Sequence, residues 1–171
     1  TWDYGEPMYQ NAMFLIPRAL IDSIGGWDES LTLINDHEFY TRLVLASGGV
    51  RFAPGARLYY RSGIEGSISK RTGRAACDSA KRAVLLSAGH LLEAEDSPRT
   101  RRAAARMIRN VVYSFYPEHA DLAAELEHEV QRLGGTDLKP QGGAAFRALA
   151  SITGWRAALR MRRLLQPNSA S

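Results

Sequence analysis

The sequence predicts an α/β protein in which a mixed first part is followed by a mainly helical second part. Two observations support this division. Short apolar runs separated by glycine and proline fill residues 1–70, a pattern typical of alternating short strands and helices. Residues 71–165 are rich in alanine, arginine, leucine and glutamate, which favour helix almost throughout. We therefore expect two units with these bounds, followed by a frayed tail over residues 166–171.

The first part alternates between predicted strands and helices. Three short apolar runs predict strands, at residues 12–16, 50–53 and 57–61. Two helices are predicted between turn signals, at residues 18–24 and 36–47. Pro17 suits the first turn of the first helix. Asp36 or Asn35 caps the second helix, because a side-chain oxygen at this position accepts a hydrogen bond from an unpaired backbone N–H.

Proline and glycine also set the helix boundaries in the second part. We expect helices over residues 74–95, 98–116 and 120–133, a linker over 134–143, and one or two short helices over 144–165. Ser97 followed by Pro98 predicts a capped helix start, since both residue types favour the first turn. Pro117 ends that helix.

Bulk properties limit the classes of protein and of partner. The 171 residues carry a formal net charge of +4, with a sequence pI of about 9.5, which suits an anionic partner or simply a solvated helix face. Cys77 is the single cysteine, so neither an internal disulfide nor a multi-thiolate metal site is available. No apolar run approaches the roughly 20 residues needed to span a bilayer. These features predict a cytoplasmic protein, with peripheral contact at the inner face of the membrane as an alternative.

The most informative motif is an acidic residue at a predicted helix start. Asp36 follows a Gly-rich turn, and a helix N-terminus favours an ionised carboxylate through its unpaired N–H groups and partial positive charge. A carboxylate held in this way suits a general base. On its spacing alone, Asp36 is better explained as a plain helix cap, and the motifs around it favour the base instead.

Three segments in order resemble the C-terminal half of the family 2 glycosyltransferases. They are Met-Phe-Leu-Ile-Pro-Arg at residues 13–18, Ile-Gly-Gly-Trp-Asp-Glu-Ser-Leu at 24–31 and Asn-Asp-His-Glu-Phe-Tyr-Thr-Arg-Leu at 35–43. The resemblance extends over roughly residues 8–70. It implies a partial, Rossmann-like GT-A fold. It also implies transfer of a sugar from a nucleotide-sugar donor to an acceptor hydroxyl with inversion, and Asp36 as the base.

The resemblance further implies two sets of binding residues. The acceptor-binding set is Gly26, Trp27, Asp28 and Asn35, although Asn35 stands where the family more often has an acid. The set near the donor diphosphate, in a closing segment, is Arg61, Ser67, Lys70 and Arg71. Trp27 has an alternative as a core or rim aromatic, and the segment over residues 62–69 has one as a solvated linker.

The nucleotide-binding half of such an enzyme, with its metal-holding Asp-x-Asp, is not recognisable in this sequence. We therefore expect a divalent metal, Mg or Mn, only in the complete enzyme, with ligands mostly outside this chain and none assigned within it. The expected partners are a nucleotide-sugar donor and a glycan, lipid-linked or protein acceptor. By itself the chain is expected to bind sugar nucleotides poorly and to be inactive.

Two other classes of function remain open. The chain fits a non-catalytic helical interaction module, to which the asparagine at residue 35 also points. It also fits a basic module that binds nucleic acid or a membrane surface. We do not expect nucleic acid, because no recognition motif accompanies the arginines at residues 99–109. Residues 155–165, with tryptophan and leucine among arginines, suit a membrane surface or docking onto the helical part.

Overall fold

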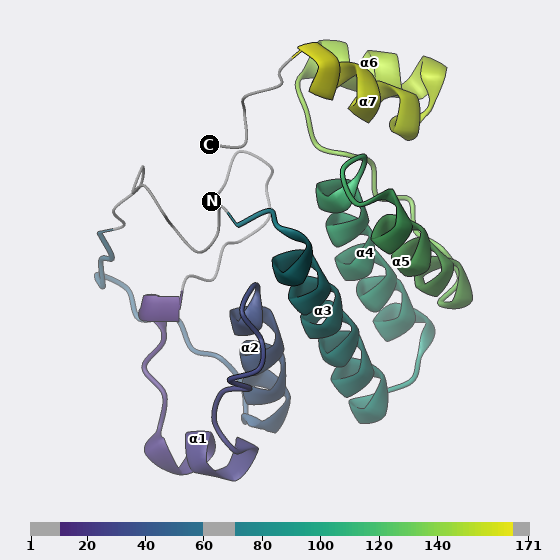
Figure 1. The fold of residues 1–171 in the computed structure, drawn as a ribbon. Coiled ribbons are helices and arrows are strands. Elements are labelled where there is room, and N and C mark those ends of the chain that lie inside the picture. The colour runs from purple at the N-terminus through teal and green to yellow at the C-terminus, as the bar shows by residue number, and fades with distance from the viewer. Residues whose placement is uncertain (1–10, 60–70, 166–171) are drawn as a thin grey trace.

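The computed structural model describes residues 11–59 and 71–165. Its regular secondary structure in these residues consists of helices (Figure 1). In chain order the elements are η1 (Asn11–Met13), α1 (Arg18–Ile24), α2 (Asn35–Ala46), α3 (Arg74–Ala94), α4 (Pro98–Phe115), α5 (Ala120–Arg132), α6 (Ala144–Thr153) and α7 (Trp155–Leu165).

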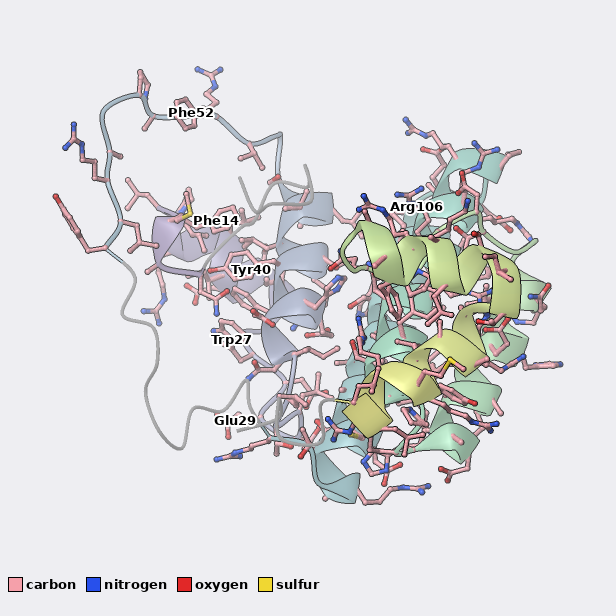
Figure 2. All side chains as sticks on the ribbon, turned by 90° about the horizontal axis from the view of Figure 1, so that it is seen from above. Phe14, Trp27, Glu29, Tyr40, Phe52 and Arg106 are labelled. Carbon is pink, nitrogen blue, oxygen red and sulfur yellow. The ribbon has the colours of Figure 1, made fainter. Side chains whose placement is uncertain are left out.

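The predicted α/β class, a partial Rossmann-like GT-A half, is therefore wrong for the described residues. The predicted strands at 12–16, 50–53 and the described part of 57–61 contain a 3-10 turn or irregular backbone instead. A strand is stable only when a neighbouring strand receives its backbone N–H and C=O groups, and none of these segments pairs with another. Their apolar side chains consequently remain outside the core, as Phe52 does on the outer loop in Figure 2.

The predicted helices are confirmed. Every helix lies within one or two residues of its predicted bounds, because local signals end it. Gly25 adopts a left-handed conformation, with a φ of 79°, and its N–H bonds back to α1. Ser97 and Thr100 form a capping box at the start of α4, with Pro98 at the first helical position.

The core lies between α3, α4 and α5, with α2 packed on the side of α3 away from α5 (Figure 1). Alanines of α3 and α4 in the core cluster, among them Ala80 and Ala104, are buried and let the two helices approach closely. Larger side chains fill the contact between α4 and α5, namely Ile108, Val112, Leu122, Leu126 and Val130. This rigid bundle supports α2 from one side.

Helices α6 and α7 form a hairpin at one end of the bundle (Figure 1). Trp155 packs its ring edge-on against Tyr113 and Tyr116 near the end of α4, with centroids 5.1 and 5.3 Å apart. Leu159 is buried and belongs to the core cluster that includes Tyr116. The predicted docking of this last segment onto the helical part is therefore confirmed for one face of α7.

Candidate functional site

Asp36 lies in the first turn of α2 and lines an open groove of about 470 Å³. One wall is the face of α2 that carries Asp36, His37, Tyr40, Thr41, Val44 and Leu45. Opposite residues come from α3 and α4, namely Ser87, Leu91 and Met107, and Asn11 completes the lining. A concave surface of this size is in the range of small-molecule sites.

The groove changes from polar to apolar along α2. Asp36 and His37 lie at the N-terminal end, and Val44 and Leu45 lie two turns further on. At about 1.5 Å per residue, the carboxylate and the apolar end are about 12 Å apart along the helix. The hydroxyl of Tyr40, between the two ends, donates to the Asn11 carbonyl over 3.0 Å and so closes the rim.

Backbone strain lies immediately before the candidate base. Ile34, at the N-cap position of α2, has a φ of 48° and makes no side-chain cap. Left-handed backbone is unfavourable for a β-branched residue, because its Cβ crowds the chain. The expectation that Asn35 or Asp36 caps this helix is thus wrong, because Ile34 holds the cap position. Asp36 Oδ1 still accepts a hydrogen bond from the His37 N–H over 2.9 Å. Strain of this kind is often found at functional positions.

His37 joins the base to α3. Its Nδ1 lies 3.2 Å from the hydroxyl of Ser87, which is fully buried and donates to the Ala83 carbonyl over 2.9 Å. Part of the residue is exposed, yet the ring nitrogen faces this buried hydroxyl. Burial there lowers the pKa of His37 more than the charge of Asp36 raises it.

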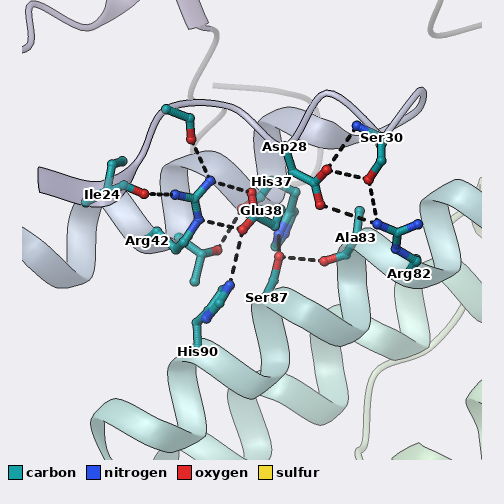
Figure 3. Close-up of polar contacts among 12 residues, drawn as sticks. Ile24, Asp28, Ser30, His37, Glu38, Arg42, Arg82, Ala83, Ser87 and His90 are labelled. Atoms are coloured by element: carbon teal, nitrogen blue, oxygen red, sulfur yellow. Dashed lines mark hydrogen bonds and ion pairs between the residues drawn. The ribbon is translucent and has the colours of Figure 1, made fainter. Parts of the chain in front are cut away.

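A buried ionic cluster holds α2 in place (Figure 3). Glu38 pairs with Arg42 on the same helix and with His90 on α3, whose Nε2 lies 3.1 Å from Glu38 Oε1. Arg42 also donates to the carbonyls of Ile24 and, over 2.8 Å, Gly26. The cluster therefore fixes α2 against both α3 and the preceding turn, which positions Asp36.

The predicted acceptor-binding residues make internal contacts instead of lining the groove. Gly26, with a φ of 74°, presents its carbonyl to Arg42. Asp28 accepts from Ser30, and these hydrogen bonds, with the charge of Arg82, lower the pKa of Asp28. Asn35 begins α2 beside Asp36 without lining the groove.

Trp27, in the turn before α2, belongs to an aromatic cluster with Phe14, Phe39 and Tyr40. Its ring stacks on Phe39 with centroids 4.1 Å apart and planes 8° from parallel, and it meets the edge of Tyr40. Phe14 contacts Tyr40 from the other side (Figure 2). Trp27 is still 41% exposed, so its outer face is open to solvent.

The predicted segment near the donor diphosphate lies mostly outside the described residues. Arg61, Ser67 and Lys70 fall in that gap, and Arg71 is exposed just before α3. Across residues 11–59 and 71–165, no group of three acidic, histidine or cysteine side chains is arranged to hold a metal ion. The divalent metal that the resemblance implies, with ligands mostly outside this chain, therefore stays a prediction for the complete enzyme.

The residues that sequence reasoning missed come from α3 and α4. Ser87, His90 and Leu91 share one face of α3, because positions three and four apart are neighbours on a helix. Ser87 and His90, two polar residues on an otherwise apolar face, were the sequence feature that could have indicated a site there. Met107 gave none, since methionine in an apolar stripe is an ordinary core residue.

Comparisons with known protein families, with curated proteins and with solved structures returned no match. The resemblance to family 2 glycosyltransferases therefore gains no support from them. Among the described helices, none is both long and apolar enough to cross a bilayer.

Proposed function

We propose that this chain contributes the general base, Asp36, to the transfer of a sugar from a nucleotide-sugar donor to an acceptor hydroxyl. The observation that carries the proposal is the carboxylate of Asp36 at the start of α2, on the wall of an open groove. The strained backbone of Ile34 directly before it, and the buried cluster around Glu38 beneath it, both support a positioned group.

In the proposed reaction the acceptor hydroxyl gives its proton to Asp36. The acceptor oxygen then forms a bond to the anomeric carbon of the donor sugar from the face opposite the nucleotide. The bond between that carbon and the diphosphate oxygen breaks, and the nucleoside diphosphate leaves with the bonding electron pair. The configuration inverts, and the protonated carboxyl releases its proton to solvent. Asp36 contributes a base at a fixed distance from the attacking oxygen.

The lining of the groove supports a lipid-linked acceptor over a glycan or a protein. A hydroxyl bound at Asp36 directs the rest of its molecule along α2 toward Val44 and Leu45, where Leu91 and Met107 form the opposite side. Apolar surface there favours a hydrocarbon body. A glycan would leave its hydroxyl groups without partners on that surface, which is unfavourable.

The proposal includes a cytoplasmic location with contact to the inner face of the membrane. Cys77 is the only cysteine and is buried as an unpaired thiol, which suits a reducing compartment. No step of the proposed reaction is assigned to a metal ion, because its expected ligands lie mostly outside this chain.

The test is transfer activity of the longest natural form of this chain, as wild type and as Asp36→Asn, with a panel of nucleotide sugars and prenol-type acceptors. Asn keeps the size of the side chain and removes the base, so we expect turnover to fall by a factor of about 100 or more. Asn35→Asp is the matched control and should retain turnover. Equal turnover of wild type and Asp36→Asn would exclude Asp36 as the base.

A second candidate is a non-catalytic helical interaction module. The helical architecture of the described residues favours it, because a GT-A half requires a sheet. This candidate predicts that no donor in the panel is consumed by either form, while the chain still binds another macromolecule.

A further inference from the structure

The net positive charge of the chain is concentrated on the hairpin of α6 and α7. The whole sequence has 22 Lys and Arg against 18 Asp and Glu. Residues 144–165 contain five arginines and no acidic residue, namely Arg147, Arg156, Arg160, Arg162 and Arg163. The remaining residues therefore hold 17 basic and 18 acidic side chains, a net charge of −1.

Contacts within the protein hold several of these arginines in position, but they leave the charge of most of them without a counter-ion. Of these five arginines, Arg163 alone forms an ion pair within the described residues, with Glu118. Arg156 and Arg160 lie over the rings of Trp155 and Tyr116, at 4.7 and 5.4 Å from the centroids. A ring restricts a guanidinium but does not cancel its charge. The hairpin thus presents fixed positive charge at its surface.

The same hairpin exposes large aliphatic side chains. Ile152 at the end of α6 is 84% exposed, and Leu164 and Leu165 at the end of α7 are 81% and 82% exposed. Met161, one turn earlier, is also exposed. Leu164 and Leu165 lie beyond Leu159, the residue of α7 that joins the core cluster. Exposed aliphatic groups among arginines are the composition of an interfacial helix.

We infer that the α6–α7 hairpin is a docking surface for an anionic lipid bilayer. The arginines are attracted to anionic headgroups, and Ile152, Leu164 and Leu165 enter the boundary between headgroups and acyl chains. The bundle is held at the membrane by the hairpin, because Trp155 fixes the hairpin to the end of α4. This inference assigns the membrane contact of the proposed function to named residues of the hairpin, and it does not depend on Asp36 or on sugar transfer.

Charge and side-chain type favour a bilayer over nucleic acid. Binding of single-stranded nucleic acid relies on aromatic rings that stack on bases. The rings of this hairpin are already engaged, Phe146 beneath Arg162 and Trp155 beneath Arg156. What remains exposed is aliphatic, which serves a lipid boundary and contributes nothing to base stacking. A second copy of the chain is disfavoured as the occupant, because two such hairpins repel each other.

The experiment is co-sedimentation of the full chain with vesicles. One set contains about one third phosphatidylglycerol in phosphatidylcholine and the other contains phosphatidylcholine alone, in about 0.1 M salt. We expect binding to the anionic vesicles and little binding to the neutral ones. Arg156→Gln with Arg160→Gln should weaken it by about 25-fold, since each basic residue near an anionic surface contributes a factor of about five. Leu164→Ser with Leu165→Ser should weaken it by about tenfold or more.

A matched control removes the same charge elsewhere. Arg99→Gln with Arg101→Gln acts at the start of α4, about 20 Å along the helix from its contact with the hairpin. It should change vesicle binding by less than about twofold. The serine pair keeps the test valid if the hairpin glutamines disturb packing, because both leucines are outside the core. Equal binding to the two vesicle types, an equal loss in the control, or binding to RNA with none to anionic vesicles would overturn the inference.

Discussion

Glu38 and Arg42 lie one helical turn apart on α2 and form a bidentate ion pair that is almost fully buried. The Arg42 Nε lies 2.5 Å from Glu38 Oε1, and Nη2 lies 2.9 Å from Oε2. The side chain of Arg42 is 19% exposed and that of Glu38 is 4% exposed. The spacing alone indicates such a pair on the helix surface, worth a few tenths of a kcal/mol. In the structure α3 and the turn after α1 cover the pair, so it is buried and not a surface pair.

Loss of the Glu38 carboxylate should destabilise the fold strongly. In Glu38→Ala the guanidinium of Arg42 stays buried without its counter-ion, so we expect the free energy of unfolding to fall by about 3 kcal/mol. Urea denaturation measures this change. The control is Asp22→Ala, which breaks the exposed i,i+4 pair with Arg18 and should cost less than about 0.5 kcal/mol. Similar losses in the two variants would contradict the buried role of Glu38.

The same pair predicts a dependence of stability on pH. Burial by itself raises the pKa of Glu38, but the hydrogen bonds and charge of Arg42, with a further contribution from His90, lower it below the ordinary value of 4.5. The unfolded chain therefore binds this proton more readily than the folded one. The stabilising contribution is complete above pH 4.5 and is lost as the pH falls toward the lower, folded pKa.

Urea denaturation between neutral pH and pH 3 measures that loss. Glu38→Gln, which does not titrate, should have lower stability at neutral pH and a smaller further decrease in acid than the wild type. An identical acid decrease in both proteins would assign the effect to other carboxylates.

The cap of α4 should be worth about 1 kcal/mol. The Ser97 side chain accepts from the Thr100 N–H, and the Ser97 N–H donates to Thr100 Oγ1 over 3.0 Å. Ser97→Ala removes the first of these bonds and should lower the free energy of unfolding by about that amount. Ser151→Ala removes a serine that bonds only to the carbonyl of Ala148 within α6, and should be nearly neutral. Thermal unfolding followed by circular dichroism compares the two.

Trp27 should contribute to stability whether or not it also contacts an acceptor. Trp27→Ala removes the ring stacked on Phe39, which is 2% exposed, and should cost about 1–2 kcal/mol. Trp27→Phe keeps a stacked ring and should recover most of the loss. Unchanged stability of the alanine variant would show that the stack contributes nothing. An acceptor role then remains a separate prediction, measured as a change in KM by Trp27→Phe.

The helices were predictable because their signals are local. Gly25 ends α1, and Ser97 with Pro98 starts α4, within a few residues of the boundary that each one sets. The strands were mispredicted because a strand depends on a partner. Apolar runs such as residues 50–53 indicate a strand only if another strand lies beside them, and the sequence of the run contains no information on that.

The candidate site was predictable only in part, for the same reason. Asp36 is a helix-start carboxylate that the local pattern indicates. Its surroundings, Ser87, Leu91 and Met107, are 51 or more residues away in sequence and arrive through the packing of α3 and α4. Arg109 is a second residue whose surroundings depend on packing with a distant part of the chain. The arginine-rich pattern places it on a solvated face, yet it is 6% exposed and pairs with Glu127 over 2.7 Å.

The apolar end of the groove should determine acceptor affinity without affecting the chemical step. Val44 and Leu45 line the groove and are exposed, so Val44→Ser with Leu45→Ser should leave stability nearly unchanged. We expect KM for a prenol-type acceptor to rise about tenfold or more while kcat is retained, because each lost apolar contact weakens binding far from Asp36. Ala46→Ser, on the same turn but outside the groove, is the control. An unchanged KM in the double variant would place the acceptor elsewhere, while loss of kcat alone would show that these residues act on the position of Asp36.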